Sequence, residues 1–351
     1  MPLNNGNAQT IPGASLITTG CGSTFWARTI GAGLLLLTLC GCALLRSAPR
    51  QPEEWTFVFF PGSSQAALDR AAGLSVLHAV ALPCAAPDTI TFAVESQCGP
   101  LNPRQDDADT RLLLVSNWAS TAYRADILRA LMAQPEGRQR FAAQAAALAS
   151  RDRYDGMLLD LRLLGPRDVN DLVSLVTSVN DSARSGGISP VGIVVPVADT
   201  SAYPGRYLGP LTDFLAVRLE LERASPGPST PRARISALLG ARAAETGAHR
   251  VMLLIPADGY AWLAGDGRRR VSFAEAVALA RDWNVDFVRD ESSSTLRARA
   301  PGRGEIWVND AALIAGIVRD ARRLGIRRFA LYGLGGEDPA IWVAIGAAVT
   351  R

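Results

Sequence analysis

The residues best suited to chemistry lie in the segment 154–162, which reads Tyr-Asp-Gly-Met-Leu-Leu-Asp-Leu-Arg. Its apolar run predicts a buried strand. Because side chains alternate between the two faces of a strand, Asp160 and Arg162 should share one face. A carboxyl group can take part in proton transfer. A guanidinium stays charged near neutral pH, with a pKa above roughly 12, so it cannot deliver a proton but can bind an anion.

A second charged pair lies in the apolar segment 213–221, where Arg218 and Glu220 should also share a face. If the two segments end side by side, these four side chains meet. One interpretation is a closed salt-bridge network, because an unpaired buried charge is costly. Another is that Arg162 or Arg218 offers its fork to a ligand carboxylate, as in a uronic acid or a lactyl-bearing sugar. A third is that Glu220 serves as an acid, although a neighbouring arginine favours its ionised form.

The elements that must position these residues alternate along the chain. Short apolar, β-rich segments predict eight strands, at residues 55–60, 75–82, 111–117, 156–163, 191–197, 213–221, 250–256 and 328–334. Helical spacing occurs at 121–133, 138–151, 167–184, 231–246, 309–324 and 338–349. Strands that alternate with helices predict a parallel sheet. Eight such strands predict a (β/α)8 TIM barrel of the α/β class, in which ligand sites lie at the C-terminal ends of the strands.

A doubly wound open sheet is the competing fold, but the first predicted strand is not followed by a Gly-rich phosphate loop. One segment, at about 271–309, breaks the alternation. It contains a predicted helix at 272–281 and two short strand-like runs at 286–289 and 305–308. We therefore expect a small α+β insertion before the last strand of a barrel that spans 55–351.

The N-terminal residues 1–42 are predicted to be a leader, followed by a linker at 43–54. Residues 30–45 form an apolar run preceded by Arg28, shorter than the roughly 20 residues of a membrane-spanning helix, and this is typical of a secretion signal. Leu39-Cys40-Gly41-Cys42 resembles the lipobox of bacterial lipoproteins, which predicts lipidation of Cys42. The expected location is the periplasmic side of the cell envelope, on the outer membrane. A cleaved signal without lipid and an uncleaved short anchor are the alternatives.

The remaining composition narrows the function classes. Two of the five cysteines, Cys84 and Cys98, lie in the body of the chain. They could form a disulfide worth about 3 kcal/mol in an oxidising compartment, or remain two separate thiols. The net charge is +3, and no basic run is interleaved with aromatic residues, so nucleic-acid binding is not expected. The two histidines are far in sequence from any carboxylate cluster, so we predict no metal site and no cofactor.

The segment 155–162 resembles the signature of glycoside hydrolase family 18, the chitinase family, which reads Asp-Gly, apolar, Asp, apolar, Asp, any residue, Glu. Further blocks match family 18 domains fused to bacterial glycosyltransferases and polysaccharide deacetylases. These blocks are Gly259-Tyr260-Ala261-Trp262, Ser272-Phe273-Ala274-Glu275-Ala276, Ile306-Trp307-Val308-Asn309-Asp310-Ala311 and the segment from Gly333 to Trp342. The resemblance covers about residues 55–349 and also implies a TIM barrel.

Departures from the family pattern fall on its catalytic positions. The family's proton-donating glutamate corresponds to Arg162, and the aspartate that orients the substrate's acetamide corresponds to Leu158. Asp155 and Asp160 match the pattern. On the sixth strand, the family's tyrosine and aspartate correspond to Glu220 and Leu221. The resemblance therefore implies a degenerate site, formed by Asp155, Asp160, Arg162 and Glu220, with impaired hydrolysis.

Four aromatic residues lie near the end of a predicted barrel strand or just after it and could line a glycan cleft: Trp118, Tyr260, Trp262 and Tyr332. Tyr332 corresponds to the family's tryptophan that forms the floor under a sugar ring. Each of these residues could equally be a core aromatic.

These observations favour a catalytically impaired, family 18-like lipoprotein that binds or scaffolds a cell-envelope polysaccharide, such as an exopolysaccharide or peptidoglycan. Proteins of polysaccharide synthesis or export are its expected partners, beside the membrane that holds its lipid anchor. The alternative is an active glycoside hydrolase on N-acetylglucosamine-containing glycans, with Glu220 or Asp160 as an altered acid.

Overall fold

The computed structural model describes residues 53–59, 64–87, 94–96, 108–119 and 122–349. All of them belong to one compact unit, Gln51–Arg351. The lipidation predicted at Cys42 lies outside the described residues. The same holds for Cys98 and for the side chain of Cys84, so their pairing stays a prediction.

Eight parallel strands close into a barrel, which confirms the predicted fold and excludes the open doubly wound sheet. The strands follow one another around the barrel in the order β1-β16-β10-β9-β8-β7-β4-β2, and β2 pairs with β1 to close it. They are β1 (Glu54–Val58), β2 (Leu77–Pro87), β4 (Thr110–Ser116), β7 (Gly156–Asp160), β8 (Val191–Pro196), β9 (Phe214–Arg218), β10 (Val251–Pro256) and β16 (Arg328–Tyr332). Each of these strands overlaps one of the eight predicted segments.

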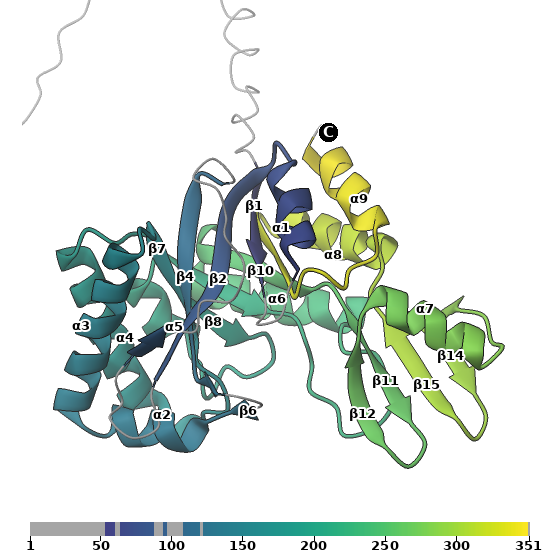
Figure 1. Ribbon diagram of the computed structural model, residues 1–351, viewed down its shortest axis with the longest axis horizontal. Helices are drawn as coiled ribbons and strands as arrows, with labels where there is room; N and C mark the ends of the chain where they lie inside the picture. The colour runs from purple at the N-terminus through teal and green to yellow at the C-terminus, as the bar shows by residue number, and fades with distance from the viewer. Residues whose placement is uncertain (1–52, 60–63, 88–93, 97–107, 120–121, 350–351) are drawn as a thin grey trace, which may run out of the picture. The chain divides into compact units, whose positions relative to one another are not determined.

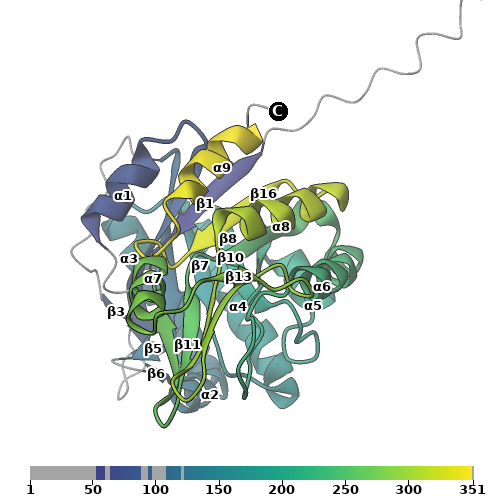
Figure 2. The same cartoon turned by 90° about the vertical axis from the view of Figure 1, so that its right-hand side faces the viewer.

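Helices surround the barrel, as the strand–helix alternation predicted (Figure 1). They are α1 (Gln65–Ala72), α2 (Ala125–Met132), α3 (Pro135–Arg151), α4 (Val169–Ser185), α5 (Gly205–Leu208), α6 (Arg232–Thr246), α8 (Ala311–Arg323) and α9 (Ala340–Val349). Figure 2 shows α8 and α9 side by side next to β16 and β1. Helix α1 was not predicted, although Ser64 caps its N-terminus by accepting a hydrogen bond from the Ala67 amide at 3.3 Å.

Two layers of apolar side chains build the core. Inside the barrel, alternate residues of the strands pack together, among them Val58, Leu114, Leu158 and Phe214. The intervening residues face outward and pack under the helices. Burial of both faces explains why the strands are nearly continuous apolar runs in the sequence.

A second sheet is inserted between β10 and α8, and it starts earlier than predicted. It consists of β11 (Gly259–Leu263), β12 (Gly267–Val271), β13 (Val288–Arg289), β14 (Leu296–Ala300) and β15 (Gly304–Val308), with α7 (Phe273–Asp282). Figure 1 shows it as a separate sheet and helix beside the barrel. The predicted bounds of about 271–309 left out the hairpin of β11 and β12, whose residues Tyr260 and Trp262 were expected to follow the seventh barrel strand.

Two properties concern only the described part of the chain. None of its helices combines the length and apolar character that crossing a bilayer requires. Nor do three of its His, Cys, Asp or Glu side chains gather in a group that could hold a metal ion.

Candidate functional site at the C-terminal end of the barrel

Arg162 lies just beyond β7, and its guanidinium is held in place on several sides. Nε and Nη2 donate hydrogen bonds to the two carboxylate oxygens of Asp160, each at 2.8 Å, and Nη2 also donates to the Tyr332 hydroxyl. The guanidinium carbon lies 4.4 Å from the ring centroid of Tyr123 and 5.3 Å from that of Tyr332. Burial opposes the charge, but Asp160 and the two tyrosines hold the pKa of Arg162 well above its usual value. Arg162 is therefore a fixed cation.

The backbone of this segment is fixed as well. Asn117, which directly follows β4 and is buried, accepts a hydrogen bond from the Arg162 amide at 2.8 Å and donates one to the Arg162 carbonyl at 3.0 Å. The buried Tyr203 hydroxyl donates to the Leu161 carbonyl at 2.8 Å. Neither Asn117 nor Tyr203 was predicted from the sequence, because each contacts a segment more than 40 residues away in the chain.

Glu220 lies two residues beyond the end of β9, in a surplus of positive charge. Its Oε1 accepts hydrogen bonds from the Tyr260 hydroxyl and from Arg268, the latter at 3.3 Å. Its Oε2 forms an ion pair of 3.6 Å with Arg218. Burial raises the pKa of Glu220, but Arg270 and Arg218 outweigh this effect, so the pKa lies below its usual range. Glu220 is therefore ionised at neutral pH and does not carry the proton that an acid catalyst needs.

A third charged pair joins the inserted sheet to the barrel, and the sequence analysis missed it. Asp258 follows β10, and both of its oxygens accept hydrogen bonds from Arg270 on β12, one of them at 2.8 Å. Burial raises the pKa of Asp258, and Arg270 opposes this rise. On the same strand, Arg268 stacks over the ring of Tyr260 at 3.7 Å. The sequence feature that could have indicated this pair is the run of three arginines, Arg268-Arg269-Arg270. None of the family 18-like motifs contains it.

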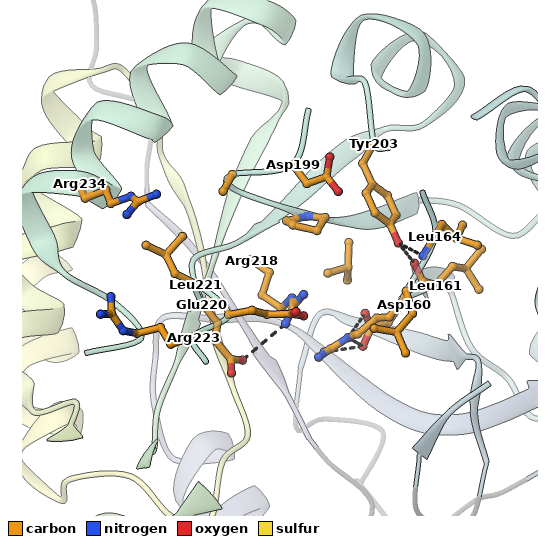
Figure 3. A pocket seen from close by; sticks show the side chains of 16 residues that line it. Asp160, Leu161, Leu164, Asp199, Tyr203, Arg218, Glu220, Leu221, Arg223 and Arg234 are labelled. Carbon is orange, nitrogen blue, oxygen red and sulfur yellow. Dashed lines mark hydrogen bonds and ion pairs between the residues drawn. The ribbon is translucent and has the colours of Figure 1, made fainter. Parts of the chain in front are cut away.

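Two cavities open around these charged groups. They share Arg162, Arg218 and Glu220, and their volumes are about 350 and 670 Å³, within the range of ligand sites. The smaller one extends toward Tyr203 and is shown in Figure 3. The larger one extends toward the inserted sheet. We refer to both together as the cleft.

The four predicted aromatic residues do not line one common cavity. Tyr260 lines the larger cavity. Trp262 lines a different cavity, with Pro226. Trp118 is half-buried and packs edge-on against Tyr123, at 4.9 Å between ring centroids. Tyr332 is only 1% exposed and lies against Arg162, so the platform expected for a sugar ring is covered.

Asp155 lies away from the cleft, which corrects its inclusion in the degenerate site. It precedes β7, whereas Asp160 ends this strand. Its Oδ2 accepts a hydrogen bond from the Arg111 amide at 2.8 Å, and its carbonyl accepts one from the Ser189 amide. Asp155 thus links the start of β7 to neighbouring backbone, a role that does not depend on catalysis.

Chemically, the cleft offers guanidinium and carboxylate groups that can bind a polar ligand. Among the described residues, Asp160, Glu220 and Asp258 are each paired with at least one arginine. At Glu220 the arginines outweigh burial and lower the pKa, whereas at Asp258 burial outweighs Arg270 and the pKa is raised.

The fold is similar to that of chitinases with solved structures. A chitinase from Chromobacterium violaceum superimposes with a TM-score of 0.71 and 22% identity, over 84% of this chain and 99% of that one. The spore cortex-lytic enzyme SleL of Bacillus megaterium gives 0.71 and 16%, over 85% and 74%. A family 18 chitinase from Cycas revoluta, in complex with (GlcNAc)3, gives 0.68 and 18%, over 85% and 100%.

The barrel therefore has the same fold as these chitinases. Among curated proteins, the uncharacterized glycosylase YvbX of Bacillus subtilis is 21% identical over 259 residues, which cover 66% of this chain and 73% of YvbX. No family model matches the sequence. The family 18-like fold predicted from the motifs is thus confirmed at the level of the barrel.

Proposed function

We propose that this protein binds a cell-envelope polysaccharide without hydrolysing it, as a lipid-anchored protein on the periplasmic face of the outer membrane. It would hold an exopolysaccharide or peptidoglycan strand, alone or for proteins that synthesise or export it. The observation that carries this proposal is the fixed Arg162, at the position that corresponds to the family's proton donor.

The geometry around Arg162 supports the loss of hydrolysis. Departure of a sugar requires a group that holds a proton and releases it to the leaving oxygen. Arg162 cannot do this, and it donates hydrogen bonds to both oxygens of Asp160, so Asp160 is held as the partner of a cation. The same guanidinium covers the ring of Tyr332.

The competing function is hydrolysis with an altered acid. Glu220 would have to carry a proton near neutral pH, whereas its arginine neighbours keep its pKa below the usual range. The known relatives favour a glycan as ligand, since the solved chitinase from Cycas revoluta is in complex with (GlcNAc)3.

Incubation of the full-length protein with N-acetylglucosamine oligomers between pH 4 and 8 tests the proposal. We expect no new reducing ends, together with retention of glycans in a binding assay. Turnover that disappears in Glu220→Gln or Asp160→Asn would instead establish a hydrolase with an altered acid.

Cys42→Ala tests the anchor, because it should move the protein from the membrane fraction to the soluble fraction.

A further inference from the structure

The arginines of the cleft differ in how they are paired. Arg162 uses its fork on Asp160, and Arg270 uses its fork on Asp258. Arg268 stacks on Tyr260 and donates to Glu220. These three guanidinium groups already have protein partners.

Arg218 differs from these three, as does Arg223, whose Nε is also buried without a partner. The side chain of Arg218 is 7% exposed, yet it makes no hydrogen bond to the residues that the structure describes. Its Nε is buried without a partner, and its contact with Glu220 is an ion pair of 3.6 Å, too long for a hydrogen bond. Arg218 borders both cavities, and Figure 3 shows it in the smaller one with Glu220.

A buried guanidinium with unused donors is costly unless a partner satisfies it. A carboxylate fits such a group best, because its two oxygens accept two parallel hydrogen bonds from the planar fork. The position is also partly apolar, since Val194 and Pro196 line the same cavity, and charged hydrogen bonds are stronger where water is excluded.

The surroundings favour a negatively charged ligand. The larger cavity is lined by five arginines and two glutamates, Arg162, Arg218, Arg223, Arg268, Arg270, Glu220 and Glu222. Asp160 and Asp258 pair with two of these arginines, so one positive charge remains in excess. A neutral sugar would leave this local excess uncompensated. A sugar carboxylate would lower it and would occupy the donors of Arg218.

We infer that Arg218 binds the carboxylate of an acidic sugar residue, so that the cleft selects acidic over neutral polysaccharide. This inference rests on the proposed glycan binding and names its ligand class. A uronic acid and a lactyl-bearing sugar both supply this carboxylate. They differ in where the group is attached to the ring, so separate probes distinguish them.

Calorimetric titration of the full-length protein tests the inference. The probes are galacturonic acid and glucuronic acid oligomers, the methyl ester of the galacturonic acid oligomer, a muramic acid disaccharide and an N-acetylglucosamine oligomer. We expect at least one acidic probe to bind more tightly than the neutral ones. For that probe, Arg218→Met should weaken binding roughly 10- to 100-fold, in keeping with the loss of charged hydrogen bonds.

The variants are chosen so that folding does not obscure the result. Glu220 keeps Tyr260 and Arg268 as partners in Arg218→Met. Arg218→Lys should give an intermediate affinity, because it retains the charge without the fork. Arg281→Met, on the exposed surface of α7, is the matched control and should bind as the wild type does.

The outcomes separate the two proposals. Binding of the neutral oligomer and the methyl ester by the wild type at least as tightly as every acidic probe would overturn the inference and leave glycan binding intact. This comparison needs no variant. Unchanged affinity of Arg218→Met for an acidic probe would also overturn it. Absence of binding to every probe, neutral and acidic, would contradict the proposed function itself.

Discussion

At the scale of single residues, the arginine at position 162 changes the role of its neighbours. Asp160 is 2% exposed and is bound through both oxygens, so it compensates a cation rather than assisting an acid. The hydroxyl of Tyr332 accepts a hydrogen bond from the same guanidinium. Arg162, Asp160 and Tyr332 thus form one connected hydrogen-bond network.

This network predicts a coupled loss of stability. Arg162→Met should lower the free energy of unfolding by about 3–5 kcal/mol, because it leaves the buried Asp160 without its partner. The double variant Arg162→Met with Asp160→Leu should recover most of this loss, since neither charge remains. Urea unfolding of the wild type, both single variants and the double variant measures the coupling. Additive effects of the two substitutions would contradict the pairing.

A second residue-scale prediction concerns Glu337, which follows the last barrel strand. Its carboxylate accepts hydrogen bonds from the Gly335 amide at 2.6 Å, Arg70 at 2.9 Å and Trp342 at 3.1 Å. Burial raises its pKa, but hydrogen bonds from its own amide, the Gly335 amide and Arg70 outweigh burial and lower the pKa below its usual value. These contacts connect the loop after β16 to α1 and α9, so Glu337 has a structural role.

Because the folded-state pKa of Glu337 is lowered, its contribution is fully present above the unfolded pKa and is lost as pH falls through the folded one. Glu337→Gln should therefore destabilise the protein by about 1–3 kcal/mol at pH 7. The difference should shrink as the pH falls below 4. Urea unfolding at pH 7 and at pH 3.5 measures it, with the exposed Glu291→Gln as control. A difference that grows at the lower pH would contradict this account.

At the scale of elements, the barrel strands were predictable and the inserted sheet was only partly so. Barrel strands are buried on both faces, which leaves long apolar runs such as 251–255 in the sequence. β12 carries three arginines within five residues and is largely exposed, so it has no such run. Its pairing with β11 depends on contacts that apolar periodicity does not record.

The cleft was predictable where residues share a strand and not where they come from distant elements. Strand alternation alone indicated that Asp160 and Arg162 share a face, and likewise Arg218 and Glu220. The contact of Arg268 with Glu220 joins residues 48 positions apart, through the hairpin that the predicted boundaries excluded. Tyr123 lies in a two-residue strand, too short to show a period.

Gly192, on β8, has no room for a larger side chain. A Cβ placed there would lie 2.3 Å from the ring of Phe214, its neighbour on β9. The ring is buried inside the closed barrel and cannot move away cheaply. Gly192→Ala should therefore destabilise the protein by about 1–3 kcal/mol.

Thermal unfolding and urea unfolding test this prediction against a matched substitution. Gly240 lies inside α6 with no atom within 4 Å of a new Cβ, so Gly240→Ala should leave stability equal or raise it by up to about 1 kcal/mol. Gly192→Ala combined with Phe214→Leu should recover part of the loss. Equal stability of the two alanine variants would indicate that the barrel interior has room at this position.

At the scale of the whole molecule, the barrel and the inserted sheet have separate cores, which differ in the size of their buried side chains. The inserted sheet buries mainly small side chains, Ala261, Val271, Ala276, Ala280, Ala298, Ile306 and Val308. The barrel buries much larger ones, such as Trp55, Phe57 and Phe329. Since apolar burial provides most of the stability, the inserted sheet is expected to be the weaker of the two. It nevertheless contributes Tyr260 and Arg268 to the cleft.

Native-state hydrogen exchange should therefore resolve two cooperative units. Amides of β14 and β15 should exchange through a partial opening of lower free energy than the global unfolding that exposes β10 and β16.

A bound acidic oligomer should slow exchange in β11 and β12, because it would contact Arg218 of the barrel together with Tyr260 and Arg268. Exchange in α3, on the outside of the barrel, serves as the control and should not change through local opening. Mass spectrometry of the exchanged peptides, followed across low denaturant concentrations, measures both effects. A single opening free energy for both sheets, unaltered by ligand, would mean that the inserted sheet is an inseparable part of the barrel and that the cleft does not bridge two units.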